Sequence, residues 1–177
     1  MIRIFDVFFS LIGLLFLSPI ILILFSIYIF QGDNAIFKQS RLGQNQKIFF
    51  IYKFRTMRID TKSVGTHLVD NKSITKFGHY LRLTKLDEIP QLLNVLKGDM
   101  SFVGPRPCLL NQKKLINERK KRGIYKVKPG ITGLAQISGI NMKTPTLLSK
   151  TDLKMINKMN LINYFYYILR TFLTIFK

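Results

Sequence analysis

The sequence is poor in acidic residues and in the residue types that build disulfide or zinc frameworks. Nine Asp and Glu stand against 28 Lys and Arg in 177 residues, which gives a formal net charge of +19. The single cysteine, Cys108, excludes an internal disulfide framework and is typical of a reducing compartment. The two histidines, His67 and His79, have no cysteine beside them, which argues against a structural zinc site. The length allows one domain with a modest core and appendages.

Charged residues are also absent from a long apolar run at positions 7–30. About 24 residues that rise 1.5 Å each are long enough to cross a hydrocarbon core of roughly 30 Å. No A-x-A-like cleavage site follows Phe30, which argues against a removable signal peptide, and a buried core helix rarely stays uncharged for so long. Because the basic residues begin directly after the run, the positive-inside rule predicts a cytoplasmic domain.

Ser18 and Pro19 interrupt the apolar run near its centre. Proline removes a backbone donor and kinks or breaks a helix, and a serine can satisfy the carbonyl that is freed. The run is therefore either a bent helix that spans the membrane or a helix-break-helix that enters and leaves by one face. In the second case Arg3 and Asp6 stay on the basic side, where they could form an i, i+3 ion pair. The residues alone leave both interpretations open.

Periodicity and turn residues predict the first elements after the apolar run. Residues 32–46 and 58–75 are polar and are expected to be loops. Residues 47–54 are β-prone, with Phe49, Ile51 and Phe54 in rough alternation, which predicts a strand. Residues 74–83 indicate a short basic helix.

The next apolar pattern predicts a helix over 86–97. Its leucines and isoleucine fall on one face, Pro90 lies in the first turn, where its missing donor costs little, and Gly98 ends the helix. The aromatic and basic stretch 153–177 suits an interfacial helix or, equally, a terminal helix that packs on the core. The segments rich in Pro and Gly, which we expect to be irregular, are 102–107 and 128–139.

Two of the nine acidic residues, Asp87 and Glu88, are adjacent at the expected start of that helix. The positive end of the helix dipole and the neighbouring Arg82 and Lys85 favour ionised carboxylates there. An ionised aspartate can act as a nucleophile, and adjacent carboxylates can hold Mg²⁺ near a diphosphate. Because acids are common in a first helical turn, a capping pair is the alternative on these residues alone.

Three basic residues are candidate phosphate ligands. Arg106 lies between Pro105 and Pro107, which restrict the backbone on both sides, and a pre-set guanidinium suits bidentate phosphate binding. Lys53 and Arg55 alternate with aromatic residues, so a strand would point both to one side. A solvated surface charge is the alternative for each.

The positive charge also raises nucleic-acid binding as an interpretation, since Phe and Tyr could stack on bases. The basic residues are scattered along the whole chain, however, and the apolar run argues for a lipid surface. Anionic headgroups attract nearby Lys and Arg by roughly 1 kcal/mol each. We therefore expect membrane lipid as a partner and no nucleic acid.

Five motifs in a fixed order are more specific than any of these residues alone. They are QSRLG, YKFRTM, ITKFGHYLR, LDEIPQLLNVLKGDMSFVGPRP and KPGITGLAQISG. With them the sequence, from about Arg3 to Gly139, resembles the bacterial sugar transferases, the monotopic phosphoglycosyl transferases of surface-glycan and glycoprotein pathways. The fourth motif is the most specific of the five.

The resemblance implies transfer of a sugar 1-phosphate from a UDP-sugar to a polyprenyl phosphate, usually undecaprenyl phosphate, with release of UMP and a need for Mg²⁺. It implies that Asp87 is the nucleophile and forms a phosphosugar-aspartyl intermediate, so that the kinetics are ping-pong. Glu88 would support the metal or the nucleophile, and both carboxylates are candidate metal ligands. The implied phosphate- and substrate-binding residues are Arg82, Arg106, Lys53, Arg55 and Gln136.

The resemblance also implies an α-rich α+β fold and a membrane topology. A re-entrant helix-break-helix with its break at Ser18 and Pro19 would occupy residues 1–31. A small membrane-associated catalytic domain with amphipathic helices and a short β-hairpin would occupy 32–150, and a C-terminal interfacial helix 151–177. The catalytic domain would lie on the cytoplasmic face of the bacterial inner membrane, where later glycosyltransferases of the pathway could bind.

The sequence departs from the family pattern at two places. Gln46 stands where many members have glycine, and Asn45 could form the unusual turn instead. After Gly139 the match thins, since the chain has no tryptophan and reads KTDLKMINKMN where members often have Trp and then Asp with a following Tyr. A catalytically silent membrane scaffold is the competing hypothesis, and the intact pair of Asp87 and Glu88 argues against it.

Overall fold

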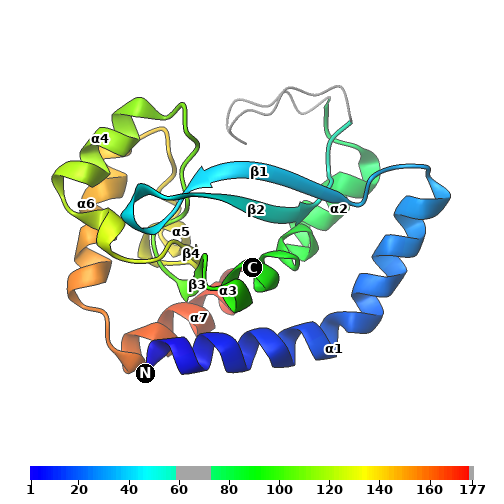
Figure 1. Ribbon diagram of the computed structural model, residues 1–177, viewed down its shortest axis with the longest axis horizontal. Coiled ribbons are helices and arrows are strands. Elements are labelled where there is room, and N and C mark those ends of the chain that lie inside the picture. Colours follow the sequence, from blue (N-terminus) through cyan, green and yellow to red (C-terminus); the bar gives the residue numbers. More distant parts are fainter. Residues whose placement is uncertain (59–72, 176–177) are drawn as a thin grey trace.

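Helices surround two small sheets in the computed structural model, which describes residues 1–58 and 73–175 (Figure 1). The expected helix-rich α+β fold with a β-hairpin is confirmed. His67 and most of the loop expected at 58–75 lie outside the described residues. The helices are α1 Ile2–Phe30, α2 Lys76–Leu83, α3 Gln91–Lys97, α4 Lys113–Lys121, α5 Leu134–Ile137, α6 Pro145–Asn157 and α7 Leu161–Ile175. The strands are β1 Ile36–Leu42, β2 Ile48–Phe54, β3 Ser101–Val103 and β4 Gly130–Thr132, and short 3₁₀ turns are η1 Gln44–Gln46, η4 Leu86–Glu88 and η5 Ile124–Lys126.

The apolar run forms one helix, α1, which bends without interruption. Pro19 lies inside α1, and its missing N–H leaves the Leu15 carbonyl without the usual helical donor. The Ser18 hydroxyl donates to that carbonyl at 2.7 Å. Figure 1 shows the two arms of α1 running in different directions, one along the lower edge and one up the right side. A single bent helix therefore replaces the expected pair of helices with a break, because the serine restores a hydrogen bond that the proline removes.

The first turns of α1 are fixed to the rest of the chain by polar contacts. The Arg3 guanidinium donates to the carbonyls of Val95 and Leu96 in α3, the second at 2.7 Å. The buried Asp6 Oδ1 accepts hydrogen bonds from β3 and α7, so Arg3 and Asp6 bind other groups in place of the expected i, i+3 pair. The donors to Asp6 are Ser101 Oγ at 2.9 Å, the Phe102 N–H at 3.0 Å and the Tyr164 hydroxyl at 2.8 Å.

The second arm of α1 packs on the β-hairpin and on α2. Leu24 and Tyr28 are buried in an apolar cluster with Phe54 of β2, and Phe77 of α2 packs against this cluster. The rings of Tyr28 and Phe54 are stacked with their centroids 6.1 Å apart, and the Tyr28 hydroxyl donates to the Arg55 carbonyl. Both arms of α1 therefore contact the same folded domain.

β1 and β2 pair antiparallel over seven residues each and form the hairpin. β2 confirms the strand expected at 47–54. The loop expected at 32–46 is wrong, because it contains β1, whose mainly polar residues become a strand only through pairing with β2. In the turn, Asn45 takes the expected left-handed conformation with φ 54°, and Gln46 shares it with φ 60°.

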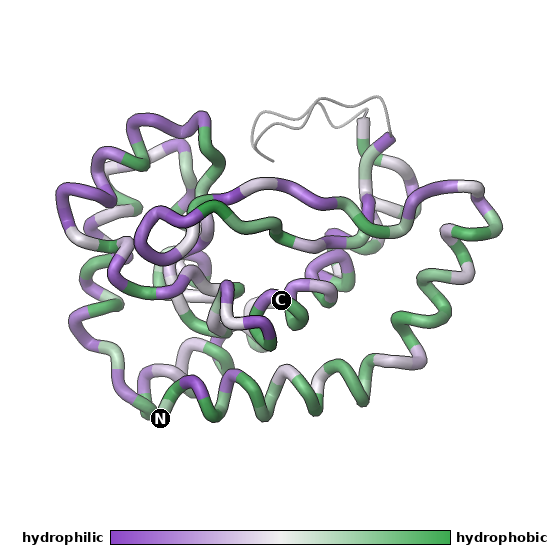
Figure 2. Tube along the Cα trace, in the orientation of Figure 1, coloured by the Kyte–Doolittle hydropathy of each residue, from purple (hydrophilic) through white to green (hydrophobic). Residues whose placement is uncertain are grey.

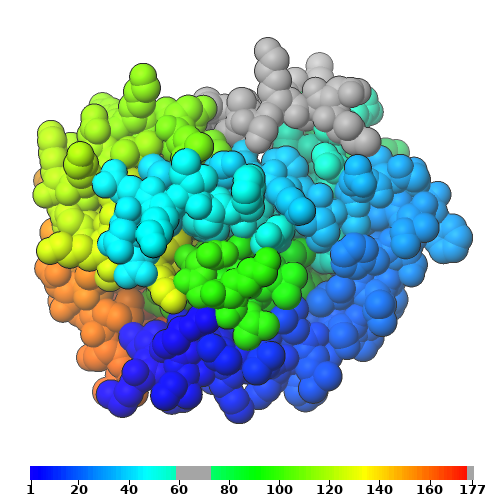
Figure 3. Space-filling model, in the orientation of Figure 1, coloured from blue at the N-terminus to red at the C-terminus, as the bar shows by residue number. Residues whose placement is uncertain are grey.

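Asn94 of α3 attaches that helix to β2. Its side-chain oxygen accepts from the Tyr52 N–H at 3.0 Å, and its side-chain nitrogen donates to the Phe50 carbonyl at 2.7 Å. A buried amide thus satisfies backbone groups that a neighbouring strand would otherwise pair with. In Figure 3, α3 (green) fills the space between the hairpin (cyan) and the first arm of α1 (dark blue). This packing holds η4, which precedes α3, against β2.

The segments expected to be irregular contain β3 and β4, which pair in parallel. Gly104 and Gly130 permit this pairing: a Cβ on Gly130 would lie 2.0 Å from the Gly104 nitrogen, and one on Gly104 would lie 2.7 Å from the Gly130 nitrogen. Only glycine fits so close a backbone approach. The glycines that predict irregular backbone are therefore the residues that allow this small sheet.

Exposed apolar side chains gather on α1 and α7. Figure 2 shows α1 as largely hydrophobic, whereas α4, on the opposite side of the molecule, is mainly hydrophilic. By length and composition α1 could cross a membrane. In α7, Tyr164 and Tyr167 are buried while Phe165, Leu169 and Phe172 are exposed, so this helix has both a core side and an exposed apolar side. The domain boundary expected after residue 150 falls inside α6.

Candidate active site

The two adjacent carboxylates lie in η4, a 3₁₀ turn directly before α3, and not in the first turn of an α-helix as expected. Pro90 explains the difference, because it has no N–H to donate to the Leu86 carbonyl four residues earlier. The Ile89 N–H donates to that carbonyl instead, at 3.2 Å, which is the tighter i to i+3 pattern. Lys85 begins the turn with a left-handed φ of 59°. The turn presents Asp87 and Glu88 toward β2.

Lys53 of β2 binds both carboxylates. Its Nζ lies 2.6 Å from Glu88 Oε1 and 3.7 Å from Asp87 Oδ2. Arg106 binds the same Glu88 oxygen from the other side, with Nη2 at 3.0 Å. Two of the expected site residues, Lys53 and Arg106, thus bind Glu88, and among the described residues Lys53 is the cation in contact with the adjacent Asp87.

The environment moves the two carboxylate pKa values in opposite directions. Burial and the neighbouring Glu88 raise the pKa of Asp87 above its ordinary value, although Lys53, Arg82 and Lys85 oppose that rise. Burial also acts to raise the pKa of Glu88, but Lys53 and Arg106 outweigh it and hold that pKa well below the usual range. Such divergence is common where two carboxylates have different chemical roles. Glu88 is therefore a fixed anion, while Asp87 is the more basic carboxylate.

Arg82 and Arg55 occupy different surroundings. Arg82 Nε donates to Thr56 Oγ1 at 2.9 Å, and its charge acts on Asp87, so it lies at the edge of the site. Arg55 donates to the Asn34 carbonyl at 3.0 Å, and its guanidinium lies 5.8 Å from the centre of a phenylalanine ring in β1. Strand alternation predicts Lys53 and Arg55 on one side, and the contacts agree. The Arg55 guanidinium faces the ring of Phe37, the β1 residue paired with Lys53, and the Arg55 N–H extends the pairing to the Ala35 carbonyl at 2.8 Å.

A pocket of about 360 Å³ lies beside the carboxylate turn. Its charged and amide lining comes from Glu88, Arg106, Lys85 and Gln136. Three threonines also line it, and the rest is apolar. The Gln136 side chain lies with its nitrogen 3.5 Å from the Gly104 carbonyl, which holds α5 against the β3 end of the pocket. The apolar lining comes from α1, the segment from η4 to α3, the small sheet, α5 and α7, and it consists of Leu17, Ile89, Leu92, Phe102, Ile131, Ile137, Ile168 and Phe172.

Sequence reasoning missed the part of this pocket that α7 supplies. Ile168, Thr171 and Phe172 come from a stretch whose only signals are apolar and aromatic residues, which are typical of any packed helix. The Thr171 hydroxyl is hydrogen-bonded to that of Thr132 in β4, which closes the pocket on this side. No local pattern identifies these residues as lining a site.

The residues present fit a magnesium ion that takes part of its ligands from the protein and the rest from a bound substrate. Mg²⁺ is commonly bound by one or two carboxylates, with substrate phosphates and water completing the octahedron. Asp87 and Glu88 supply two carboxylates in one turn. Within residues 1–58 and 73–175, no group of three or more His, Cys, Asp or Glu could hold a metal on its own. The donor set therefore suits a metal that arrives with a phosphate.

Comparison with known proteins assigns the chain to a family. The bacterial sugar transferase family matches residues 1–177. The chain is 48% identical over 124 residues to the uncharacterized sugar transferase EpsL of Bacillus subtilis (strain 168). The aligned part is 68% of this chain and 61% of that protein. It is 40% identical over 170 residues to the galactosyl transferase CpsE of Streptococcus agalactiae serotype III (strain NEM316). The aligned part is 88% of this chain and 38% of that protein.

A third relative carries a more explicit name. The chain is 41% identical over 143 residues to the UDP-glucose:undecaprenyl-phosphate glucose-1-phosphate transferase of Escherichia coli (strain K12), over 76% of this chain and 30% of that protein. The chain thus spans less than two thirds of the length of each of these three relatives. On the match across its whole length and on these identities, the chain belongs to the bacterial sugar transferase family.

Proposed function

We propose that this protein transfers a sugar 1-phosphate from a UDP-sugar to undecaprenyl phosphate and releases UMP, in the first membrane step of a bacterial glycan or glycoprotein pathway. The observation that carries the proposal is the pair of Asp87 and Glu88, bound by Lys53 and Arg106 beside a mainly apolar pocket. A lipid phosphate is complementary to this arrangement, because its apolar chain suits the pocket and its anionic head suits Lys53 and Arg106. The name of the Escherichia coli relative gives a reaction of this type for that protein.

Asp87 is the proposed nucleophile. One of its carboxylate oxygens attacks the phosphorus that bears the sugar, and the bond from that phosphorus to the UMP oxygen breaks, so that UMP leaves with the bonding electrons. A phosphate oxygen of undecaprenyl phosphate then attacks the same phosphorus and releases the Asp87 carboxylate. One site thus serves a soluble donor and a lipid acceptor in turn, which gives ping-pong kinetics.

The electrostatics favour Asp87 over Glu88 for this role. Glu88 Oε1 is held by two cations at 2.6 and 3.0 Å, which lowers its basicity and fixes its position. Asp87 has a raised pKa through burial, and a more basic carboxylate is a stronger nucleophile once it is ionised. Glu88 instead orients Lys53 and Arg106 around the reacting phosphate.

Basic side chains of the site would bind the phosphates of the donor and of the departing UMP. Arg106 and Lys53 already face the carboxylate turn, and Arg82 lies close enough for its charge to act on Asp87. Arg55 and Gln136 are proposed to contact more distant parts of the substrates. A bound Mg²⁺, held by Asp87 and Glu88, would offset negative charge on the diphosphate.

The contacts of α1 support a re-entrant topology. The family and the long apolar helix indicate membrane association. Arg3 and Asp6 bind one side of the domain, and Tyr28 binds the hairpin of the same domain. A helix with both ends bound to one domain keeps both ends on one side of a bilayer, so the bend would enter the membrane and return. We propose the cytoplasmic face of the inner membrane, where the pathway's later glycosyltransferases could collect the product.

The test is UMP release by the purified protein in nanodiscs, with undecaprenyl phosphate, Mg²⁺ and a panel of UDP-sugars. Asp87→Asn should reduce the rate by about 10³-fold or more, and Glu88→Gln should leave a small residual activity. Asp33→Asn, the same change in the loop after α1, is the matched control and should retain the rate. Intact mass spectrometry after mixing with donor alone should show an adduct of one sugar phosphate on Asp87. Near-normal turnover by Asp87→Asn would rule out the covalent route.

A further inference from the structure

The segment that carries Arg106 cannot satisfy its own backbone. Pro105 and Pro107 have no N–H, so this stretch has lost donors that a turn or strand would use. Its carbonyl oxygens are in a buried part of the molecule and need donors from elsewhere. The groups that supply these donors fix the backbone position from which the Arg106 side chain extends.

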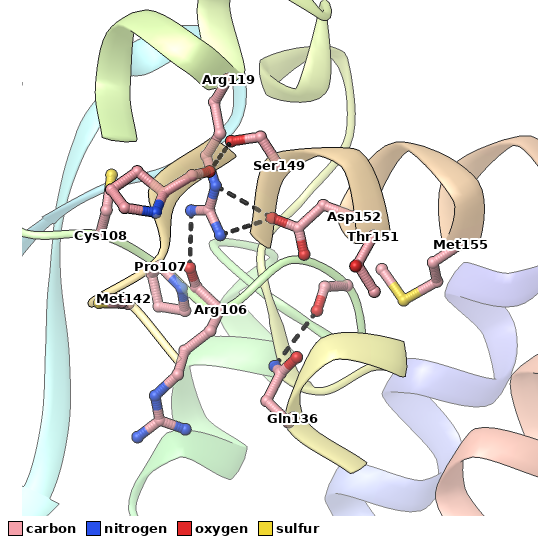
Figure 4. Close-up of polar contacts among 12 residues, drawn as sticks. Arg106, Pro107, Cys108, Arg119, Gln136, Met142, Ser149, Thr151, Asp152 and Met155 are labelled. Atoms are coloured by element: carbon pink, nitrogen blue, oxygen red, sulfur yellow. Dashed lines mark hydrogen bonds and ion pairs between the residues drawn. The ribbon is translucent and has the colours of Figure 1, made fainter. Parts of the chain in front are cut away.

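Arg119 of α4 supplies the first donor. Its Nη1 donates to the Arg106 carbonyl at 2.7 Å, while Nε and Nη2 donate to Asp152 Oδ2 of α6 at 3.1 and 2.8 Å (Figure 4). Arg119 is 2% exposed, and Asp152 is fully buried. A buried ion pair is weak evidence for stability, since removing two charges from water offsets much of their attraction. The pair is better explained by geometry, because it holds an Arg119 nitrogen on the Arg106 carbonyl.

Arg41 of β1 supplies a second donor on the opposite side. Its Nη1 donates to the Pro107 carbonyl at 3.0 Å, and its Nη2 donates to the side-chain oxygen of Gln39. The next carbonyl, that of Cys108, accepts from the Leu42 N–H at 3.1 Å. Three consecutive carbonyls, at positions 106 to 108, are thus held by α4 on one side and by β1 on the other.

We propose that Arg119, oriented by Asp152, and Arg41 are positioning residues for Arg106. They fix the Arg106–Pro107 backbone, and thereby the direction from which the Arg106 guanidinium reaches Glu88 and the substrate phosphate. The inference rests on the proposed function. It adds three residues that lie outside the carboxylate turn and act through Arg106.

The Arg106 side chain needs this support because it is itself only partly enclosed. It is 39% exposed, and its contact with Glu88 is one hydrogen bond from Nη2 at 3.0 Å. A long, partly exposed side chain samples many rotamers unless its backbone and its end are both held. Misplacement of a binding group by about 1 Å can cost 10²-fold in rate. A fixed carbonyl at residue 106 removes the backbone part of that freedom.

The test replaces Arg119 by lysine. Lysine keeps the charge for Asp152, but it has one nitrogen and cannot bind the carboxylate and the Arg106 carbonyl as the separate nitrogens of a guanidinium do. Arg119→Lys should lower kcat by about 10- to 100-fold in the UMP-release assay, and it should also lower the melting temperature because buried hydrogen bonds are lost. The control is Arg122→Lys in the turn after α4. Arg122 donates to Glu118, and this variant should keep the wild-type kcat.

A double-mutant cycle separates positioning from a general loss of structure. In an Arg106→Ala background, Arg119→Lys should change kcat by less than about twofold, because its target is gone. An equal loss in both backgrounds, or an unchanged kcat in the single variant, would overturn the inference. Asp152→Asn should reproduce the same dependence on Arg106 to a smaller extent, because asparagine still accepts a hydrogen bond.

A second readout does not depend on turnover. In ¹⁵N-arginine-labelled protein, the Nε–Hε signal that Arg106→Ala removes identifies Arg106. The chemical shift of that signal should move to the value typical of mobile arginines in Arg119→Lys and stay unchanged in Arg122→Lys. If the wild type releases no UMP while the signal responds in this way, the proposed reaction fails and the positioning contact holds. If the signal does not respond, the positioning role fails whatever the activity.

Discussion

Replacing Asp6 by alanine should detach the first arm of α1 from the domain. One oxygen of Asp6, in a side chain that is 2% exposed, accepts from Ser101, the Phe102 N–H and Tyr164 at 2.8 to 3.0 Å. Hydrogen bonds to a charged group contribute about 1.5–3 kcal/mol each. The two hydroxyls can rotate toward other acceptors and the buried carboxylate carries a desolvation cost, so the net loss is smaller than the sum. We expect Asp6→Ala to lower the free energy of unfolding by about 3–5 kcal/mol.

Two further variants separate the parts of this contact. Asp6→Asn keeps an acceptor but loses the charge, and neutral hydrogen bonds are about half as strong, so it should cost about half as much. Tyr164→Phe removes one hydroxyl donor and should cost about 1–2 kcal/mol. For a chain of this size 1 kcal/mol corresponds to roughly 2–4 °C, so Asp6→Ala should lower the melting temperature by about 6–20 °C.

The assay is thermal unfolding in detergent micelles, with Asp33→Ala as the control for loss of an acidic residue. A tag at the N-terminus of each variant, probed with a membrane-impermeant label on intact cells, reports whether the first arm still returns to the domain. A decrease of less than about 2 °C for Asp6→Ala would refute the reasoning. The same conclusion would follow if Tyr164→Phe were as costly as Asp6→Ala, since the acceptor would then not be the common element.

Two other predictions concern the site and the fold. Lys53→Met should raise the pKa of Asp87 further, because Lys53 is the strongest of the charges that lower it. Since the proposed mechanism needs ionised Asp87, the acid limb of kcat/KM should move to higher pH. Lys97→Met, which removes a lysine over the Tyr52 ring, should leave it in place. Gly78→Ala should cost about 2 kcal/mol or more, because its Cβ would lie 2.1 Å from the Thr56 carbonyl oxygen, and a fall of less than about 2 °C in melting temperature would contradict this.

The candidate site could be predicted from sequence to the extent that its residues share one continuous motif. Asp87, Glu88 and Arg106 belong to the segment from Leu86 to Pro107, so the resemblance names them together. Lys53 was expected from the alternation of β2 and does reach the carboxylates. Arg55 lies on the same side of the hairpin but donates to the Asn34 carbonyl, a contact that no local signal predicts.

The sequence by itself determined the elements whose cause is local. The uncharged run predicts α1, the Ser18–Pro19 pair predicts a freed carbonyl and its replacement donor, and alternating residues predict β2. Each of these depends on contacts within a few positions along the chain. Five short motifs in a fixed order likewise indicate the family, which the family match confirms.

Only the tertiary structure decided the contacts between distant segments. β1 becomes a strand through its partner, and the Asp6 carboxyl can be buried because donors 95 and 158 positions later bind it. Arg119 and Asp152, 33 positions apart, are both buried beside a carbonyl of Arg106. A residue's partners depend on which segments pack together, and sequence spacing alone does not contain that information.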